Sequence, residues 1–527
     1  MRNQFIVLST ITVLAILAAA FFLTPWALLA FIIVGPLVFF GSMDLIQKKQ
    51  TIRRNFPLLG AGRYWMEKLR PKIYQYFVES EIDGTPINRM FRSIIYQRAK
   101  SDLDTLPFGT KMEVYRAGYE WVNHSMSPLN SKSLNQDPRI TVGGPDCIKP
   151  YDASILNISA MSYGALSKNA VLSLNLGAKM GGFAHNTGEG SISPYHEEPK
   201  GDLIWQIGTG YFGCRTLEGG FDEELFQKRS NSDQVKMIEI KISQGAKPAH
   251  GGILPAAKNN EEIASIRNVK PHTEVVSPPY HTAFSGPEGL ISFIKKLRDL
   301  SGGKPIGFKL CLGQKSEFIT LCKEMIKTGV KPDFITVDGG EGGTGAAPLE
   351  FSNSVGMPLR EGLAFVYDAL VGYNLKEDIK IFASGKIFTA FHIFRALSLG
   401  ADACYTARGV MIALGCIQAL ECNNNNCPTG ITTHKPHLVQ GLVVSDKSKR
   451  VANFHKDTVE ALVELLAATG LDKLSKINRT HINRRLNMTQ IKRYDEIYPE
   501  VQPGEFLKDN YPAGMELHVK EADAYFG

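Results

Sequence analysis

Three cysteines lie close together late in the chain, at Cys416, Cys422 and Cys427, and Pro428 follows the last of them. Three thiolates at this spacing can bind a single iron-sulfur cluster, and a proline often follows cysteines of that kind. A zinc site would need a fourth ligand, for which His434 is available, and buried unreactive cysteines are the remaining alternative. The spacing favours the iron-sulfur cluster.

Three basic residues form a second candidate site. Lys241 ends an apolar run, Lys247 lies in the glycine-rich turn that follows, and Arg267 comes twenty residues later. A lysine within an apolar strand is costly to bury unless an anion meets it. These cations could clamp a dicarboxylate, although a solvated loop with ordinary ion pairs would also explain them.

Two later segments combine small polar residues with one basic residue each. The first, Ala-Ser-Gly-Lys, ends at Lys386, and the second contains Thr406, Ala407 and Arg408. In barrel enzymes the loops after the seventh and eighth strands often bind a phosphate group. The pattern favours a phosphate-bearing cofactor over ordinary helix-entry turns with solvated basic residues.

A glycine-rich loop at residues 340–345 matches the spacing Gly-x-Gly-x-x-Gly of dinucleotide sites. Ala346, Ala347 and Pro348 follow where such a site would open a helix, so the match fails in context. Glycine permits backbone to approach a flat ligand closely. We therefore expect such an approach here, with a merely tight turn as the alternative.

The elements that must position these residues alternate between strand and helix. Strands are expected at 155–159, 235–241, 306–310, 334–337, 379–382 and 403–406, and helices at 167–180, 316–328, 359–371, 388–399 and 411–419. This alternation implies a parallel sheet. It favours an α/β fold of the (β/α)8 TIM barrel type, whose catalytic groups lie where strands end. A doubly wound open sheet is the alternative.

The beginning of the chain has a different composition. Residues 4–43 contain no Asp, Glu, Lys or Arg, whereas the 527-residue chain is 21% charged overall. Because a bilayer crossing needs about 20 apolar residues, this run predicts a transmembrane helical hairpin, at 5–23 and 26–40, that turns near Pro25. A single long crossing and a cleaved signal peptide are the alternatives.

Basic residues follow the uncharged run, at Lys48, Lys49, Arg53 and Arg54, against only Arg2 before it. The positive-inside tendency predicts an inner or plasma membrane location with the catalytic domain in the cytoplasm. The basic cluster also suits an anionic leaflet. The net charge of +7 is too modest and too scattered to indicate a nucleic-acid partner.

We therefore expect four parts in the chain. They are a transmembrane hairpin at 1–45, a helical connecting region at 46–140, the barrel with its cysteine loop at 141–480, and a C-terminal extension at 481–527. Helical spacing at 64–79 and 87–100 supports the connecting region. The tail beyond Asn487 is expected to be irregular.

Taken together, these motifs resemble the FMN-binding synthase domain of the glutamate synthase family, and in particular its stand-alone, membrane-anchored members. The matching phrases run in family order from Ile155 to about Leu471. They are Ser-Ala-Met-Ser-Tyr-Gly-Ala-Leu-Ser at 159–167, His-Asn-Thr-Gly-Glu-Gly at 185–190, Gln-Gly-Ala-Lys-Pro at 244–248, Ser-Pro-Pro at 277–279, Asp-Gly-Gly-Glu-Gly-Gly-Thr-Gly-Ala at 338–346, and Gly-Cys through Cys-Pro-Thr-Gly at 415–430.

The resemblance implies FMN on the barrel and a 3Fe-4S cluster on the three cysteines. It places Met161, Ser162 and Gly164 along the isoalloxazine, Lys309 near the ring, Gly342 and Gly343 beside the ribityl chain, and Gly385, Thr406 and Ala407 at the phosphate. Lys241, Lys247 and Arg267 would bind 2-oxoglutarate or a similar keto acid. Glu189, with Lys241 and Lys247, would be catalytic.

The activity that the resemblance implies is that of an oxidoreductase acting on CH-NH2 donors. It would reduce 2-iminoglutarate, formed from 2-oxoglutarate and ammonia, to glutamate with hydride from FMN. A ferredoxin-like or membrane-borne donor protein would supply the electrons. His250 and Ile253 depart from the family pattern, which leaves a related amine-acting enzyme of the N-methylglutamate type open. A non-enzymatic, membrane-anchored zinc or scaffold protein is the further alternative.

Overall fold

The chain divides into two units, Met1–Arg89 and Met90–Gly527. The computed structural model describes residues 1–526, and the side chains of residues 1–524. The expected domain limits at residues 45, 140 and 480 are finer than this division and stay predictions.

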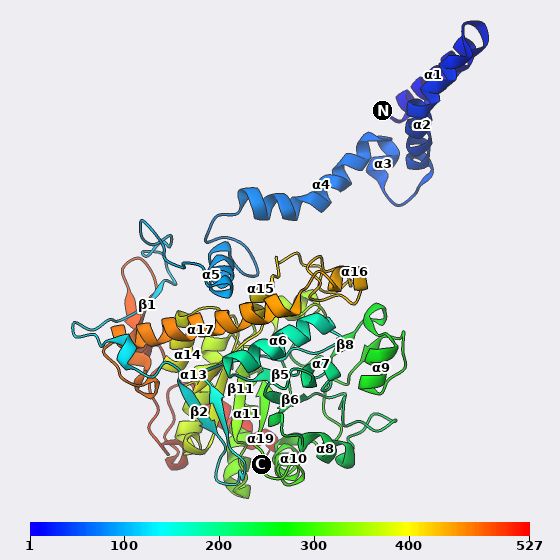
Figure 1. Cartoon of the computed structure of the whole chain (residues 1–527). Helices are drawn as coiled ribbons and strands as arrows, with labels where there is room; N and C mark the ends of the chain where they lie inside the picture. The colour runs from blue at the N-terminus through cyan, green and yellow to red at the C-terminus, as the bar shows by residue number, and fades with distance from the viewer. Residues whose placement is uncertain (527) are drawn as a thin grey trace. The chain divides into compact units, whose positions relative to one another are not determined.

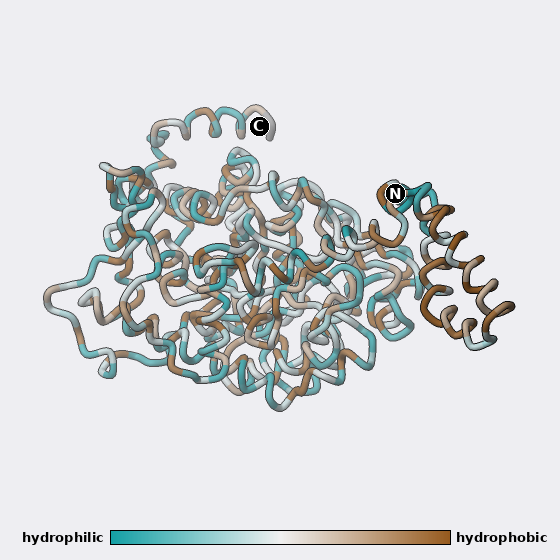
Figure 2. The backbone as a smooth tube through the Cα atoms, turned by 90° about the horizontal axis from the view of Figure 1, so that it is seen from above, coloured by the Kyte–Doolittle hydropathy of each residue, from teal (hydrophilic) through white to brown (hydrophobic). Residues whose placement is uncertain are grey.

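The N-terminal unit begins with apolar helices. Helix α1 spans Arg2–Phe22, and a short 3-10 helix, η1 (Pro25–Ala30), leads into α2 (Phe31–Ile46). Within residues 1–526, α1 and the segment Pro25–Ile46 are the two segments long and apolar enough to cross a membrane, with mean hydropathies of 2.6 and 2.1. Figure 2 shows both as hydrophobic. The helices form as predicted, and their crossing of a membrane stays a prediction.

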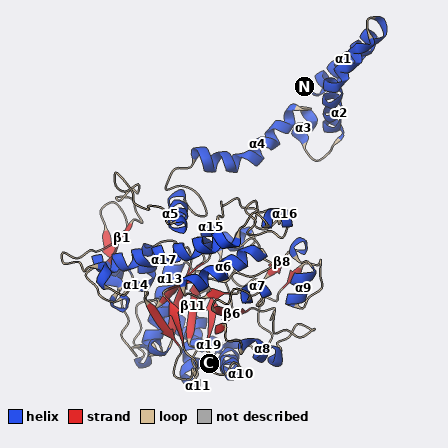
Figure 3. Ribbon diagram, viewed as in Figure 1, coloured by secondary structure: helices blue, strands red, loops and turns tan. Residues whose placement is uncertain are grey.

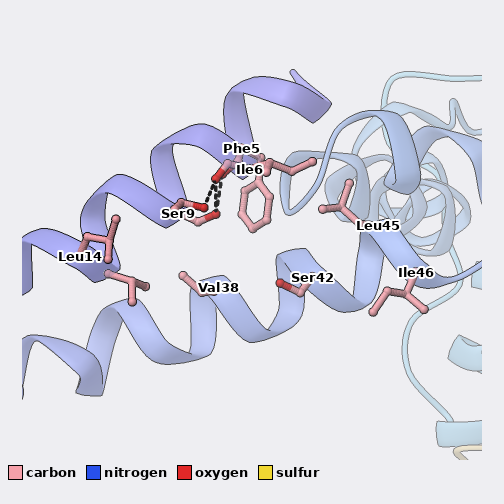
Figure 4. A pocket seen from close by; sticks show the side chains of 10 residues that line it. Phe5, Ile6, Ser9, Leu14, Val38, Ser42, Leu45 and Ile46 are labelled. Atoms are coloured by element: carbon pink, nitrogen blue, oxygen red, sulfur yellow. Dashed lines mark hydrogen bonds between the residues drawn. The ribbon is translucent and has the colours of Figure 1, made fainter. Parts of the chain in front are cut away.

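Helices α1 and α2 lie side by side around an open pocket of about 510 Å³, whose lining includes Phe5, Ser9, Val38 and Ser42 (Figure 4). A side-chain carbon at Gly41 would collide with the ring of Phe5, so this glycine allows the ring to lie on α2. The Ser9 hydroxyl donates to the Phe5 carbonyl at 2.6 Å. This bond gives the Ser9 hydroxyl a hydrogen-bond partner within a helix whose other side chains are mostly apolar.

Further helical segments complete the N-terminal unit. They are α3 (Thr51–Asn55), α4 (Leu59–Ile73) and η2 (Tyr74–Val78), a π-helical turn that continues α4. The helix predicted at 64–79 therefore begins earlier than expected.

Within residues 1–526, eight parallel strands of the second unit form a closed barrel (Figures 1 and 3). They are β4 (Leu156–Ile158), β5 (His185–Asn186), β6 (Leu203–Ile207), β7 (Val235–Lys241), β10 (Ile306–Leu310), β11 (Phe334–Asp338), β12 (Lys380–Ser384) and β13 (Ala403–Thr406). The last strand pairs with the first, with Thr406 opposite Ile158. The predicted (β/α)8 barrel is confirmed, and closure excludes an open sheet.

Helices connect and surround these strands. They are α6 (Lys168–Gly181), α7 (Pro194–Glu197), α8 (Glu223–Ser230), α9 (Glu261–Arg267), α10 (Gly286–Leu300), α11 (Lys315–Thr328), α12 (Leu349–Ser354), α13 (Leu359–Gly372), α14 (Ala390–Ser398), α15 (Arg408–Leu414), α16 (Pro436–Val439) and α17 (Val444–Ala468). The helix predicted at 411–419 is wrong at both ends: α15 begins earlier, at Arg408, and Gly415, with φ of +111°, ends it early.

Smaller elements lie outside the barrel. Helix α5 spans Arg89–Lys100. Two strand pairs join β2 (Arg139–Val142) with β3 (Tyr151–Ser154), and β8 (Ile253–Leu254) with β9 (Val275–Val276). A three-stranded sheet consists of β1 (Glu120–Val122), β14 (Ile482–Arg485) and β15 (Ile491–Arg493).

The expectation of an irregular tail beyond Asn487 is wrong. Strand β15 pairs antiparallel with β14, and α18 (Tyr494–Ile497) and α19 (Met515–Phe526) follow. The Tyr494 hydroxyl donates to the buried Glu120 carboxylate at 2.7 Å, which ties the tail to β1. These elements are short and depend on distant partners, so local sequence patterns could not reveal them.

The barrel core provides a stability prediction. Phe382 in β12 is fully buried and stacks on Tyr405, with ring centroids 4.9 Å apart. Phe382→Ala should lower the free energy of unfolding by about 3–5 kcal/mol, because it leaves a cavity in a close-packed core. Urea unfolding followed by circular dichroism measures the change. Phe108→Ala, at a fully exposed phenylalanine, is the control and should change stability little; equal effects would contradict the core assignment.

Candidate active site at the carboxyl ends of the barrel strands

Four charged side chains meet where barrel strands end. Glu189 follows β5, Lys241 is the last residue of β7, Lys247 lies in the next loop, and Arg267 ends α9. The Lys241 ammonium donates to the Glu189 carboxylate, with Nζ 2.7 Å from Oε1. Burial would raise the pKa of Glu189, but the three cations hold it below its ordinary value. The structure thus brings together the four residues predicted for substrate and catalysis.

The three cations of this cluster are almost inaccessible to solvent. Lys241, Lys247 and Arg267 expose 6%, 2% and 6% of their surface. Burial lowers the pKa of Lys247 to about 8 and that of Arg267 to about 10, although Glu189 opposes both shifts. One carboxylate facing three cations leaves an excess of two positive charges when all four groups are ionised. Such an excess is costly to bury unless an anion meets it.

The position of Arg267 depends on its neighbours. Its Nη2 donates to the Tyr163 carbonyl at 3.1 Å, and its guanidinium lies over the Phe212 ring, 5.0 Å from the centroid. Within the described part of the chain, the buried Nε has no hydrogen-bond partner. A Cβ at Gly164, where φ is +100°, would lie 2.9 Å from Nη2. Glycine at 164 therefore leaves room for the guanidinium, whose Nε–H can donate to a ligand.

Met161, Ser162 and Gly164 lie in the loop after β4. The Met161 amide donates to the Asn186 carbonyl at 3.0 Å, and the Met161 carbonyl accepts a bond from His196 Nε2 at 3.1 Å. The loop is therefore held to both β5 and α7. Fixed backbone of this kind can support a planar ligand at the barrel mouth.

Lys309 in β10 is a buried cation at the end of the barrel interior. Its Nζ lies 3.3 Å from Asp338 Oδ2, which also accepts the Gly245 amide at 2.8 Å. Burial would lower the pKa of Lys309, but Asp338 and Glu239 raise it above the ordinary value. Lys309 is therefore a fixed positive charge, and Asp338 joins it to the loop that carries Lys247.

Glu239, in the middle of β7, was not predicted as a site residue. It is fully buried and accepts hydrogen bonds from Asn186 Nδ2 at 2.8 Å, Gln206 Nε2 at 2.6 Å and Thr336 Oγ1 at 2.6 Å. A carboxylate inside an apolar strand was the available signal, because such a group needs several donors to be buried. From within the barrel, the charge of Glu239 raises the pKa of Lys309 and so stabilises its charged form.

Gly385, Thr406 and Ala407 lie at the ends of β12 and β13, which are neighbours in the barrel. Lys386 and Arg408 come next in the chain. Burial lowers the pKa of both basic groups, and the charge of Arg408 lowers that of Lys386 further. Glu341 raises the pKa of both groups and Asp338 raises that of Arg408, but neither carboxylate restores the ordinary values. These two partly buried cations therefore form a second place where an anion is favoured.

Gly342 and Gly343 lie in the loop after β11. A Cβ at Gly342 would lie 2.9 Å from the Ala246 amide nitrogen, and one at Gly343 would lie 3.2 Å from Arg408 Nη1. Glycine therefore lets this loop run close to the loop of Lys247 on one side and to Arg408 on the other. This loop therefore lies between the cluster that contains Lys247 and the pair formed by Lys386 and Arg408.

The cysteines lie in the loop after α15. Burial raises the pKa of Cys416 to about 11, and Cys422 and Cys427 contribute to the rise, so the three thiols are close enough to interact. Hydrogen bonds from Thr429 and Thr432 lower the pKa of Cys427 against the effect of burial. Among residues 1–526, no group of three His, Cys, Asp or Glu side chains is arranged to hold a metal ion. The metal assignment therefore stays a prediction.

Lys258 and His434 tie the cysteine loop to the loop after β4. The buried Lys258 ammonium donates to the carbonyls of Cys422 at 2.8 Å and Ala165 at 3.3 Å. His434 Nε2 donates to the Gly164 carbonyl at 2.8 Å, so that nitrogen does not serve as a zinc ligand. Lys258 was missed because its polar surroundings in the sequence are typical of a surface turn.

Comparison with known proteins connects this geometry to a family. A family model described as a conserved region in glutamate synthase matches residues 142–472. The chain belongs to the glutamate synthase family. The glutamate synthase large subunit-like protein YerD of Bacillus subtilis is 38% identical over 503 residues, which are 86% of this chain and 95% of that protein.

Other members of the glutamate synthase family align over a shorter range. The archaeal glutamate synthase (NADPH) of Methanocaldococcus jannaschii is 36% identical over 323 residues, which are 61% of this chain and 60% of that protein. The archaeal-type glutamate synthase (NADPH) of Thermotoga neapolitana is 32% identical over 323 residues, 60% of each chain. The chain thus spans less than two thirds of these two relatives. Family membership confirms the resemblance and the prediction of a glutamate synthase-like oxidoreductase.

The Lys309–Asp338 pair allows a test of the site's electrostatics. Asp338→Asn should lower the free energy of unfolding by about 3 kcal/mol, because it leaves a buried ammonium without its nearest carboxylate. The double variant Lys309→Met with Asp338→Asn should recover much of this loss, since no unpaired charge remains. Chemical denaturation of both variants measures the difference.

An exposed ion pair serves as the control for that test. Asp495→Asn removes the partner of Arg493, whose side chain is 48% exposed, and should cost less than about 1 kcal/mol. A double variant less stable than Asp338→Asn alone would show that the destabilisation does not come from the unpaired charge.

Proposed function

We propose that this member of the glutamate synthase family is an FMN- and iron-sulfur-dependent oxidoreductase that reduces 2-iminoglutarate, formed from 2-oxoglutarate or a similar keto acid and ammonia, to glutamate. The observation that supports it most is the charge of the buried cluster. Three cations and Glu189 leave two positive charges, which match a dicarboxylate. A keto acid with a single carboxylate would leave one of them unmatched.

The residues of the chain fit FMN. Lys386 and Arg408 would face the phosphate together with Gly385, Thr406 and Ala407; Gly342 and Gly343 would run along the ribityl chain; and Met161, Ser162, Gly164 and Lys309 would border the isoalloxazine. Bound FMN supplies hydride chemistry. The raised pKa of Lys309 keeps a positive charge where a reduced, anionic ring would need one.

Glu189 and Lys241 are suited to hold and move a proton. Their 2.7 Å contact joins Glu189 Oε1 to Lys241 Nζ beside the excess positive charge. Imine formation releases water and requires protons to be moved on and off the nitrogen and oxygen. Lys247 and Arg267 would hold the substrate carboxylates, so that its keto carbon is presented in one orientation.

The cysteines and the N-terminal helices extend the proposal. Cys416, Cys422 and Cys427 supply a thiol set of the number that a 3Fe-4S cluster requires, and such a cluster carries single electrons. The helices α1 and α2 would anchor the protein in the inner or plasma membrane, with the barrel in the cytoplasm. Electrons would then come from a ferredoxin-like or membrane-borne donor.

An N-methylglutamate type of activity is the second candidate. Lys247 Nζ donates to the Gly251 carbonyl at 2.6 Å, and a Cβ at Gly252 would lie 2.7 Å from Glu189 Oε1. The apolar Ile253 comes directly after these two glycines. The family pattern has glutamine where this chain has Ile253, and an apolar side chain there would favour an N-alkyl group more than the glutamine amide would.

The reaction is tested by chemical reduction of the purified protein with 2-oxoglutarate and ammonia, and separately with methylamine. We expect glutamate from the first mixture, identified by mass spectrometry, and N-methylglutamate from the second if the second candidate holds. A colourless, iron-free protein that forms neither product would contradict both and favour a scaffold.

The low pKa of Lys247 predicts how substrate binding depends on pH. Its ammonium loses its charge as pH rises through about 8, so dicarboxylate affinity should be constant below that pH and fall above it. The fall approaches tenfold per pH unit, because each unit removes about nine tenths of the remaining charged form. Isothermal titration calorimetry with 2-oxoglutarate from pH 6 to about 9.5 measures the profile.

Two variants control the pH experiment. Lys247→Arg should flatten the profile, because a guanidinium stays charged throughout this range. Lys456→Arg, at a side chain that is 71% exposed, should leave the profile unchanged. A profile that still falls near pH 8 in Lys247→Arg would assign the titration to another group.

Lys247→Ala should lose turnover while the protein keeps its yellow flavin.

The cysteine loop gives a separate prediction. Cys422→Ser should abolish iron binding and leave FMN in place, because the proposed flavin residues lie in other loops. Metal analysis and the visible absorbance spectrum measure the two cofactors independently. Cys404→Ser is the control at a buried cysteine in β13 and should retain iron. Equal loss of iron from both variants would show that folding rather than ligation is affected.

A further inference from the structure

We infer that α4 and η2 form an interfacial helix that lies in the surface of an anionic membrane, with one apolar face among the lipid chains. The inference rests on the membrane anchoring proposed above and extends it to a segment that does not cross the bilayer. It is drawn from exposure, spacing, charge and the connection between α2 and α4.

One face of this segment is apolar and exposed. Trp65 and Leu69 are four residues apart, and Met66, Leu69, Ile73 and Phe77 follow at intervals of three or four residues, which places all five on one side of a helix. We call them the α4 apolar face. Trp65 is 72% exposed and Phe77 is 84% exposed. A row of large apolar groups in water is unfavourable and indicates a surface that contacts something else.

The charges beside this face are those of a membrane-surface helix. Arg63, Lys68, Arg70 and Lys72 accompany a single acid, Glu67, so α4 has a net charge of three positive units. Helical spacing puts Arg63 and Arg70 on one flank of the apolar face and Lys68 and Lys72 on the other. Amphipathic helices that lie in anionic interfaces have this arrangement of basic flanks and aromatic groups.

The segment between α2 and α4 is folded so that α4 begins close to the end of α2. Asp44, near the end of α2, is 2% exposed and accepts Arg53 Nε at 2.7 Å with one oxygen and the Leu58 amide at 3.0 Å with the other. A Cβ at Gly60 would lie 2.7 Å from the Arg53 Cα, so glycine allows the first turn of α4 to pack on α3. This fixed corner would keep α4 at the level where the chain leaves the bilayer.

Tryptophan fluorescence of the full-length protein in nanodiscs tests the inference. The chain has tryptophans at 26, 65, 121 and 205. Trp26→Phe leaves Trp65 as the reporter of α4, Trp65→Phe leaves Trp26 as the reporter of the hairpin, and the double variant gives the background of the other two. The nanodiscs contain phosphatidylglycerol and phosphatidylcholine, with or without bromine at carbons 6 and 7 of the acyl chains.

We expect the emission of Trp65 to be roughly twofold lower with brominated lipid, because its ring would lie at the boundary of the acyl chains. Unquenched Trp65 with quenched Trp26 would overturn the inference while leaving the anchor intact, and blue-shifted emission would then indicate docking on protein. Unquenched Trp26 would instead show that the proposed anchoring fails, so the two failures are distinguishable.

A matched pair of substitutions gives the second readout. Leu69→Glu, in the Trp26→Phe background, places a charge on the α4 apolar face and should abolish the quenching of Trp65. Leu517→Glu makes the same change at a leucine of α19 that is 61% exposed, and should leave the quenching unchanged. Full quenching in Leu69→Glu would overturn the assignment of this face to lipid.

Discussion

Closure of the barrel between β13 and β4 is the constraint on which the candidate site depends. Thr406 pairs with Ile158, and the Ser159 amide donates to the Thr406 carbonyl at 3.1 Å, although these residues are far apart in the chain. In an open sheet, the loops that follow β4 and β13 would lie at opposite edges. Closure makes them neighbours, and the Ser167 amide then reaches the Ile431 carbonyl at 2.8 Å.

Charges inside the barrel and charges at its mouth have different roles. Glu239 accepts bonds from three side-chain donors and Lys309 has Asp338 beside it, so each interior charge has partners within the protein. In the cluster of Lys241, Lys247 and Arg267 at the mouth, the cations outnumber the one carboxylate that faces them, Glu189. Because an uncompensated buried charge costs several kcal/mol, a ligand that neutralises it is favoured by a comparable amount. Part of the free energy of binding an anion would therefore come from relief of the uncompensated charge in the unbound protein.

The sequence was informative where a pattern is local. Strands β7, β10 and β13 were predicted with the bounds that the structure shows, because each is a short β-branched or apolar run that ends at a polar turn. Strand β5 has only His185 and Asn186, which is too short to produce a pattern. The clustering of Glu189 with Lys247 and Arg267 came from family resemblance, because no spacing rule relates residues on separate loops.

Residues that act through distant contacts could not be predicted. Lys258 looks like part of a polar turn, and only the tertiary structure shows its ammonium between the Cys422 and Ala165 carbonyls. Tyr494 lies in a tail without clear periodicity, and its role appears only when Glu120 is placed beside it. In both cases the partner is more than 90 residues away, and pairing at that separation is decided by the fold rather than by local propensity.

In the N-terminal unit, one charged residue lies both at the end of the uncharged run and at a corner between helices. Asp44 is the first acidic residue after forty positions without a charged side chain. A carboxylate at the end of an apolar helix would ordinarily be solvated, yet this one is buried and uses both oxygens, for Arg53 and for the Leu58 amide. Its charge is therefore compensated within the protein. The residue that ends the uncharged run also fixes the start of α4, so the corner does not depend on water for its stability.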